Sequence, residues 1–335
     1  MRKHILPACL ALLASSVAHA QAGTQLYGVA DLWAGRSATA GGGPAQRVLN
    51  SGGLTTSYWG LGGSEDIGAG TLALYAVEGY LQADTGAAGR TPGDALFARN
   101  AWVGLAGALG EIKLGRILNP LFTASAQVNP FGGSIRFAPL LAQMWSPAMG
   151  RAVAGDTSWD NMALYTSAPV ADWRLQLYAT AGEAAVRGIG NAGATVGFSR
   201  GAVTAVLVAQ RVRVGPGLAT VGESVQRSWF AGAAVPLGPV KVYGSWAVAN
   251  ADRPSLRSRI ASAGASVPAG GGAILAAWAR TRTEGPAASG TRTTTAAGYD
   301  YPLSKRTDLY AVAQRDTVRG AAGAHSLGLG MRHRY

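Results

Sequence analysis

The sequence contains a single cysteine, Cys9, among 335 residues. Cys9 lies in an N-terminal stretch with a basic start, an apolar middle and an A-x-A pattern at 18–20. These features predict a cleaved secretory signal peptide over 1–20. We therefore expect a mature chain that begins at Gln21 and forms one domain over 21–335. Without Cys9 the mature chain has no disulfide, thiolate nucleophile or cysteine metal ligand.

Long hydrophobic runs are also missing. The mean hydropathy is +0.14, yet no stretch after residue 20 approaches the 18 consecutive apolar residues of a membrane-spanning helix. Charged residues make up 14% of the chain, against about a quarter in ordinary soluble domains. A closed transmembrane β-barrel fits both observations, because it spans the membrane with strands and bonds all its backbone groups internally.

Acidic side chains are scarce and the chain is basic. Removing the signal peptide leaves 27 Lys and Arg against 17 Asp and Glu. The arginines are scattered through apolar segments instead of gathered in one patch, so the sequence does not predict nucleic-acid binding. The mature histidines, His325 and His333, both lie on the last predicted strand, and no metal cluster or phosphate loop appears. The sequence does not predict an enzyme, a cofactor or a metal site.

The recurring unit is eight to twelve residues of small or apolar side chains in period-2 alternation, followed by a turn. This is typical of transmembrane β-strands. We predict sixteen strands, near 24–35, 55–63, 70–82, 95–105, 110–116, 159–168, 172–181, 191–199, 202–212, 226–235, 239–249, 257–267, 272–283, 291–301, 307–316 and 325–335. Short connections alternate with longer ones, as periplasmic turns alternate with extracellular loops in outer-membrane barrels.

The last strand shows the alternation clearly. Leu327, Leu329 and Met331 share one face, and Arg332 and Arg334 lie on the other. A wall between lipid and water accounts for both faces, because a charge in hydrocarbon is costly. The strands near 202–212 and 273–279 are apolar on both faces, so their orientation stays open.

Several motifs, in order, resemble the Gram-negative general porins, which are sixteen-stranded and usually trimeric outer-membrane diffusion channels. The motifs are LYGVAD at 26–31, WGLGGSEDIG at 59–68, RNAWVGL at 99–105, LGR at 114–116, YDYPLSKRTDLY at 299–310 and GLGMRHRY at 328–335. The resemblance implies a homotrimer, with outer-membrane lipid and lipopolysaccharide as surroundings.

The resemblance also implies that loop three folds into the lumen and narrows it. The connection 117–158 is the only one long enough for this role, and it contains Arg136 and Arg151 but no Asp or Glu between 117 and 155. Arg99 matches a lumen arginine that faces loop three in the family. Tyr58, Gly62 and Leu164 stand where the family often has charged residues. Tyr58 is expected to fill space on the lumen wall.

Other basic residues occupy positions that we expect to face inward: Lys113, Arg174, Lys241, Arg280, Arg282 and Arg292. Rings of basic side chains favour anions in a water-filled pore, so the sequence predicts a porin that passes small hydrophilic solutes and prefers anions. Two alternatives stay open. One is a solute-specific channel with a binding site at loop three, and the other is a structural or adhesive barrel with a blocked lumen. For Arg99, a wall salt bridge to Glu78 or Asp31 without effect on transport is the competing interpretation.

Overall fold

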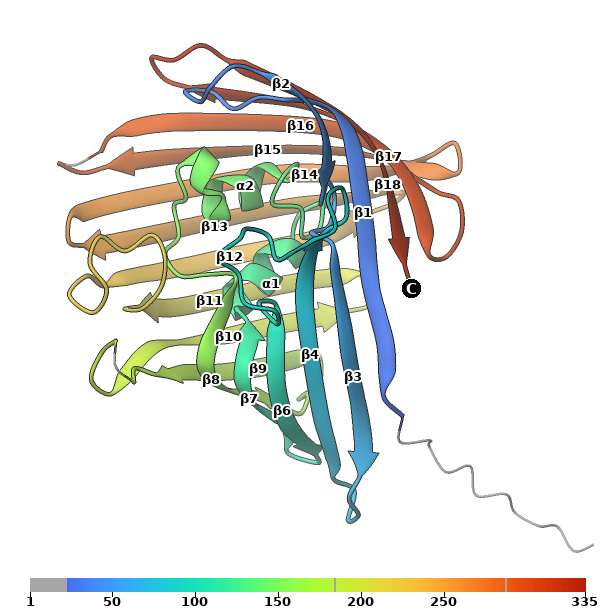
Figure 1. The fold of residues 1–335 in the computed structure, drawn as a ribbon, viewed down its shortest axis with the longest axis vertical. Helices are drawn as coiled ribbons and strands as arrows, with labels where there is room; N and C mark the ends of the chain where they lie inside the picture. The colour runs from blue at the N-terminus through green and yellow to red at the C-terminus, as the bar shows by residue number, and fades with distance from the viewer. Residues whose placement is uncertain (1–22, 184, 287) are drawn as a thin grey trace, which may run out of the picture.

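The computed structural model describes residues 23–183, 185–286 and 288–335. The predicted signal peptide, Cys9 and Gln21 lie outside the described residues. Sixteen long strands form a barrel (Figure 1). Their bounds are β1 (Gln25–Ser37), β3 (Tyr58–Asp66), β4 (Leu72–Gln82), β6 (Asn100–Gly107), β7 (Gly110–Leu118), β8 (Ser158–Ser167), β9 (Trp173–Ala181), β10 (Ile189–Arg200), β11 (Val203–Val212), β12 (Gln226–Leu237), β13 (Val240–Asp252), β14 (Ser255–Ala269), β15 (Gly272–Glu284), β16 (Gly290–Pro302), β17 (Thr307–Val318) and β18 (Ala324–Arg334).

The barrel closes between its first and last strands. β1 pairs antiparallel with β18 from Val29 to Arg36, and its earlier part, from Gln25 to Val29, pairs with β3. Every other neighbouring pair along the chain is antiparallel as well. The prediction of a closed, sixteen-stranded antiparallel barrel is therefore confirmed.

Two short strands and one tight connection were not predicted. β2 (Gln46–Ser51) folds back onto the end of β1, and β5 (Ala87–Ala88) pairs with the end of β4. The expected connection 250–256 shrinks to residues 253–254, because β13 and β14 both run further than their sequence pattern indicates. Within the described residues, no helix is long and apolar enough to cross a membrane.

The two faces of each strand differ as the alternation predicts. Leu327, Leu329 and Met331 on β18 are exposed on the outside, whereas Ser326 and Gly328 between them are buried on the inside. Exposing so broad an apolar surface to water would be unfavourable in free energy. The large apolar side chains on the outer face therefore indicate contact with lipid.

Residues 119–157, called loop 3 below, contain the helices. They are α1 (Pro120–Gln127), α2 (Pro139–Trp145) and the 3₁₀-helix η1 (Pro147–Met149). Asn119 caps α1 by accepting a hydrogen bond from the Leu121 amide at 2.8 Å, and a proline begins both α-helices. Proline suits a first helical turn, where its missing N–H has no intrahelical partner to lose.

Loop 3 packs against side chains on the inner face of the wall. Phe137 and Leu141 are fully buried in a cluster with Trp33 of β1 and Val312 of β17. The rings of Trp33 and Phe137 lie edge to face, with centroids 5.0 Å apart. Figure 1 shows α1 and α2 within the outline of the barrel, consistent with the expectation that loop three folds into the lumen.

Glycines on the wall allow this close approach. A Cβ atom built on Gly264 would lie 2.8 Å from Pro130, and one built on Gly328 would lie 2.7 Å from Phe137. These strand glycines therefore make room for the tip of loop 3. Polar contacts also hold loop 3 to the wall, because the Gln143 side-chain amide donates to Thr294 at 2.8 Å and accepts from Thr281 at 2.6 Å.

Candidate pore constriction

Arg99 and Tyr58 come together on the inner wall. Arg99 directly precedes β6, and its guanidinium lies 3.9 Å from the centre of the Tyr58 ring on β3. Arg99 also forms an ion pair with Glu78 on β4, and Glu78 accepts a hydrogen bond from Tyr27 at 2.7 Å. Glu78 thus balances the charge of Arg99. A salt bridge between Arg99 and Glu78 on the wall is one of the arrangements that the sequence left open.

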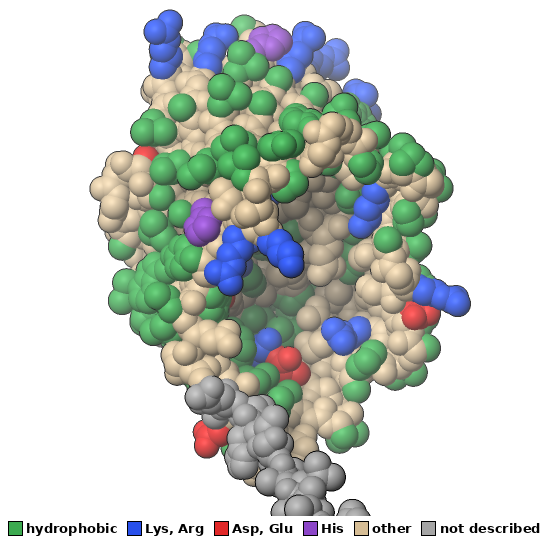
Figure 2. Space-filling view, turned by 90° about the vertical axis from the view of Figure 1, so that its right-hand side faces the viewer, with side chains coloured by type: hydrophobic (Ala, Val, Ile, Leu, Met, Phe, Trp, Pro, Cys, Tyr) green, Lys and Arg blue, Asp and Glu red, His purple; other side chains and the backbone are tan. Residues whose placement is uncertain are grey.

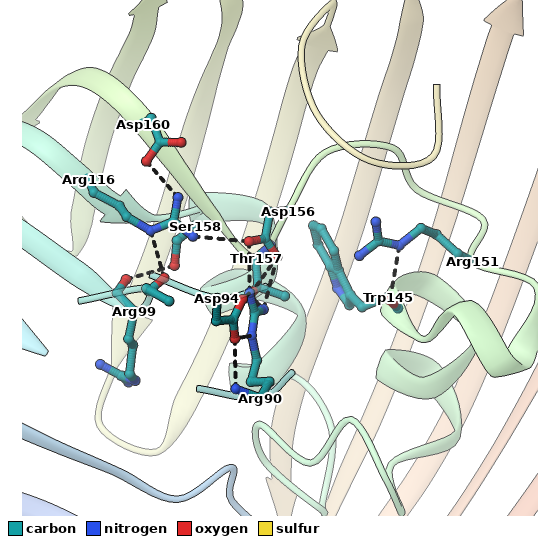
Figure 3. A network of polar contacts seen from close by, with 11 residues as sticks. Arg90, Asp94, Arg99, Arg116, Trp145, Arg151, Asp156, Thr157, Ser158 and Asp160 are labelled. Atoms are coloured by element: carbon teal, nitrogen blue, oxygen red, sulfur yellow. Dashed lines mark hydrogen bonds and ion pairs between the residues drawn. The ribbon is translucent and has the colours of Figure 1, made fainter. Parts of the chain in front are cut away.

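A second cluster joins the segment before β6 to the end of loop 3 (Figure 3). Arg90 donates to both oxygens of Asp94 at 2.8 Å and to both oxygens of Asp156 at 3.0 Å. Arg116 on β7 forms ion pairs with Asp156 at 3.0 Å and with Asp160 at 2.6 Å. This Arg90 network ties the C-terminal end of loop 3 to two separate parts of the barrel.

The charged groups of this network stabilise one another. Burial alone would raise the pKa of Asp156, but hydrogen bonds from Arg90 and its charge outweigh burial and hold the pKa below its usual value of 3.8. For Asp94, too, burial would raise the pKa, but the hydrogen bonds and the charge of Arg90 outweigh burial and lower it. Burial would lower the pKa of Arg90, yet its bonds to the two carboxylates raise it. All three groups are therefore held in their charged forms.

Arg136 in loop 3 has a different environment. Its guanidinium donates to Ser326 at 2.8 Å, to Ser37 at 3.0 Å and to Gln314 at 3.3 Å, and it lies 5.3 Å from the ring of Trp33. Among the described residues, no carboxylate lies within ion-pair distance of it. Burial lowers the pKa of Arg136, and the charge of Asp316 partly offsets this effect.

Arg151, also in loop 3, is similarly unpaired. Its Nε atom donates to the Trp145 carbonyl at 3.1 Å, and within the described ranges it makes no ion pair. Figure 3 shows its guanidinium turned toward the Arg90 network, with the Trp145 side chain between them. Burial lowers the pKa of Arg151, and the charge of Asp156 partly offsets this effect.

Lys113 and Arg292 both lie on the inner wall and are both neutralised. Lys113 on β7 pairs with Glu111 and lies 4.3 Å from the centre of the Trp102 ring. Arg292 on β16 pairs with Asp316 at 2.7 Å. Their inward positions agree with the alternation, but their charges are balanced by the wall itself.

Arg174 lies on the inner face of β9 and lines a polar cavity of about 330 Å³. Gln176 on the same strand, Gln127 of α1 and Thr195 of β10 also line this cavity. In the part of the chain that the structure describes, Arg174 makes no ion pair. A second cavity of about 370 Å³ lies on the other side of loop 3, with Arg90 and Arg136 among its lining residues.

Arg280 and Arg282 do not face the lumen. On β15 the inward positions are taken by Ala279 and Thr281, which are buried, and the two arginines are exposed on the outer face. The expected inward position of both residues is therefore wrong. The apolar pattern of β15 gave no period-2 signal from which its orientation could be read.

The family positions that lack a charge do face inward. Gly62 lies against the Tyr27 ring on the inner wall, where a built Cβ would come within 3.3 Å of that ring. Leu164 on β8 is buried beside Tyr178.

Lys241 on β13 also faces inward, with its Nζ atom 5.6 Å from the centre of the Tyr243 ring. Figure 2 shows a hollow in the face that looks to the right in Figure 1, with basic side chains at its edge.

Comparison with known proteins identifies the family. The pattern of the Gram-negative porins matches residues 8–321. The chain belongs to the Gram-negative porin family. It is a multi-pass β-barrel protein of the outer membrane. One curated relative of this porin, outer membrane porin protein 32 of Delftia acidovorans, is 34% identical over 142 residues, which is 40% of this chain and 39% of the relative.

Solved structures share the fold across nearly the whole chain. An anion-selective porin from Comamonas acidovorans aligns with a TM-score of 0.75 and 22% identity, covering 94% of this chain and 100% of that one. OmpT of Vibrio cholerae, in a form lacking loop L8, aligns with a TM-score of 0.70 and 15% identity, covering 93% and 99%. OmpF of Salmonella typhi aligns with a TM-score of 0.69 and 12% identity, covering 94% and 98%.

Sequence reasoning missed the Arg90 network of this porin. Arg90 and Asp156 are far apart in the sequence and both lie in connections, so no periodicity relates them. One signal was available, because Asp156 directly follows the long stretch of loop 3 that contains no carboxylate. A lone acidic residue at the end of such a stretch is a natural partner for a basic side chain elsewhere.

Proposed function

We propose that this porin forms a water-filled channel for passive diffusion of small hydrophilic solutes and ions, with a preference for anions. We further propose that the channel is narrowest beside loop 3. One observation carries the proposal: Arg136 and Arg151 of loop 3 have no carboxylate partner among the described residues, whereas Arg99, Lys113 and Arg292 of the wall are each paired.

Unpaired charges decide the ion preference of a pore, because the electrostatic field of an ion pair of opposite charges is weak at a distance. A net positive charge beside a narrow aqueous path raises the local concentration of anions, and low-dielectric walls strengthen this effect. The name of the Comamonas acidovorans porin, which describes it as anion-selective, supports the same preference here.

The test is the reversal potential of single channels in a planar bilayer under a KCl gradient. We expect ohmic steps with an anion-selective potential. Arg136→Gln with Arg151→Gln should move the potential toward zero selectivity, because the unpaired charge is removed. Arg315→Gln is the matched control, since Arg315 lies exposed on the outer face of β17.

Other outcomes distinguish the remaining functions. A cation-selective potential in the unaltered protein would contradict the proposed role of loop 3. Flux that saturates with one solute would instead favour a solute-specific channel, for which the cavity beside Arg174 is the candidate site. The absence of conductance from folded protein would favour a structural barrel with a blocked lumen.

The assembly state and the surroundings are part of the proposal. We propose a homotrimer in contact with outer-membrane lipid and lipopolysaccharide. The trimer form of Vibrio cholerae OmpT, which shares the fold, supports the assembly. Light scattering of the purified protein with its detergent contribution subtracted would measure it, and a monomer mass would contradict it. The family and the fold point to a channel rather than an enzyme.

A further inference from the structure

Six arginines, called the outer arginine patch below, lie on the outer face of four barrel strands, two strands on either side of β13. They are Arg211 on β11, Arg227 on β12, Arg257 and Arg259 on β14, and Arg280 and Arg282 on β15. In each strand the residues that alternate with them, such as Ser228 and Ser258, are buried on the inner side. All six lie near the strand ends away from the short turns, which is the extracellular end of an outer-membrane barrel.

The register places like charges opposite each other. Arg211 is directly opposite Arg227, and Arg259 is directly opposite Arg282. Like charges in directly opposed positions destabilise a sheet. An opposed pair of this kind that no carboxylate of the chain bridges therefore indicates that an anion from outside the chain neutralises it.

Carboxylates of the chain supply this neutralisation for only one of the two opposed pairs. Glu284 pairs with Arg282 at 2.7 Å and with Arg259 at 3.3 Å. Among the described residues, Arg211, Arg227, Arg257 and Arg280 make no ion pair, and the Nε atom of Arg211 is buried without a hydrogen-bond partner. Six arginines and Glu284, together with the exposed Asp252 at the same end of β13, leave a surplus of four positive charges on this surface.

The depth of the patch matches the headgroup layer. Trp229 is exposed on the same face of β12, two residues from Arg227, and Leu207 is exposed on β11. Two residues of strand span about 7 Å, so apolar lipid-facing surface begins directly below the arginines. An outward arginine costs about 2–4 kcal/mol at the bilayer midplane and about 0–1 kcal/mol near the interface.

The opposite ends of the same strands carry no such charge. Their outward positions are apolar and include Leu237 on β12, Val240 and Val242 on β13, and Ile274 on β15. The surface therefore distinguishes one leaflet of the membrane from the other. A second copy of the chain would bring the same positive surplus, so self-association through this surface is disfavoured.

We propose that the outer arginine patch binds the phosphate groups of a phosphorylated glycolipid in the outer leaflet. Guanidinium groups match phosphate oxygens in bidentate geometry and keep their charge at any physiological pH. A phosphate placed between Arg211 and Arg227 would bridge this opposed pair, as Glu284 already bridges Arg259 and Arg282. The inference rests on the contact with lipopolysaccharide proposed above, to which it assigns a site, and it is independent of the ion preference of the pore.

The test measures binding of diphosphorylated lipid A to the purified, folded protein in detergent. The patch variant carries Arg227→Gln, Arg257→Gln and Arg280→Gln, and the control carries Arg200→Gln, Lys305→Gln and Arg306→Gln, which remove three exposed charges at the short turns. We expect at least a tenfold loss of affinity in the patch variant, since each basic residue near an anionic surface contributes about 1 kcal/mol. The control should change less than twofold.

Two further probes identify the ligand chemistry. We expect dephosphorylated lipid A and phosphatidylglycerol to bind the unaltered protein more weakly than diphosphorylated lipid A. Equal binding of either probe, or an unchanged affinity in the patch variant, would overturn the proposal. If the triple variant does not fold, Arg227→Gln and Arg280→Gln are measured singly, each with an expected loss of about fivefold. The readout uses no current, so it does not depend on the proposed channel function.

Discussion

Two arginines of the wall, Arg99 and Arg292, differ from the two of loop 3 in what surrounds their charge. On the wall, Arg99 and Arg292 each meet a buried carboxylate of a neighbouring strand. In loop 3, Arg136 and Arg151 are held by hydroxyl, amide and carbonyl groups. A paired charge mainly holds strands in place, whereas an unpaired charge acts on ions that pass. The same residue type thus contributes to stability in one region and to transport in the other.

The largest effect that tests this comparison is on stability. Asp316→Asn should destabilise the barrel by about 3 kcal/mol, because a buried pair that loses one partner leaves a buried charge uncompensated. Asp316 is 1% exposed and also bonds Thr294 and the Ala40 amide. The measurement is the unfolding midpoint in denaturant, in lipid vesicles.

The matched control for Asp316 is Asp172→Asn. Asp172 pairs with Arg200 at 3.8 Å on the surface, and such exposed pairs contribute about 0–1 kcal/mol. Equal destabilisation by the two substitutions would show that the wall pairs have no special structural role, and the contrast between wall and loop would fail.

A smaller effect sharpens the comparison for transport. Arg99→Gln should shift selectivity toward cations, because it leaves the carboxylate of Glu78 unbalanced on the inner wall. At about 8 Å in water a single charge alters the free energy of an ion by about 0.5 kcal/mol, with opposite sign for cations and anions. The anion-to-cation permeability ratio should therefore change by roughly fivefold. The measurement is the reversal potential under a KCl gradient.

The double variant decides between two roles of Arg99. If Arg99 acts only as half of a pair, Arg99→Gln combined with Glu78→Gln should restore the original permeability ratio. If Arg99 acts as a free constriction charge, the double variant should stay shifted, and the division between paired wall and unpaired loop would not hold at this position.

The sequence predicted the fold because the membrane imposes a strict pattern. Alternation placed Lys113 and Arg174 inward and Leu329 outward, since each strand separates lipid from the lumen. It failed where that contrast disappears. β15 has alanine on both faces, so the side taken by Arg280 and Arg282 could not be read from the pattern.

The candidate site was less accessible to sequence reasoning. Arg99 was found through the family motif, but its pairing with Glu78 was only one of two alternatives. The Arg90 network joins connections whose paths depend on how loop 3 packs, and that packing depends on wall glycines such as Gly264. Such contacts between distant segments leave no periodic signal in the sequence.

A further effect on stability, smaller than that of Asp316→Asn, concerns how loop 3 is anchored as the pH changes. The pKa of Asp156 is lowered in the folded protein, so its contribution to stability is fully present above the usual value of 3.8 and is lost as the pH falls through the lower folded value. Asp156 is about one-fifth exposed, which limits the contribution to about 1 kcal/mol.

We expect Asp156→Asn to lower the unfolding midpoint by a constant amount from pH 7 to about pH 4, and the difference should shrink below that range. Asp160→Asn is the control, because Asp160 belongs to the same network but is two-thirds exposed. A difference between Asp156→Asn and the unaltered protein that persists undiminished at pH 2 would mean that the Asp156 charge does not anchor loop 3.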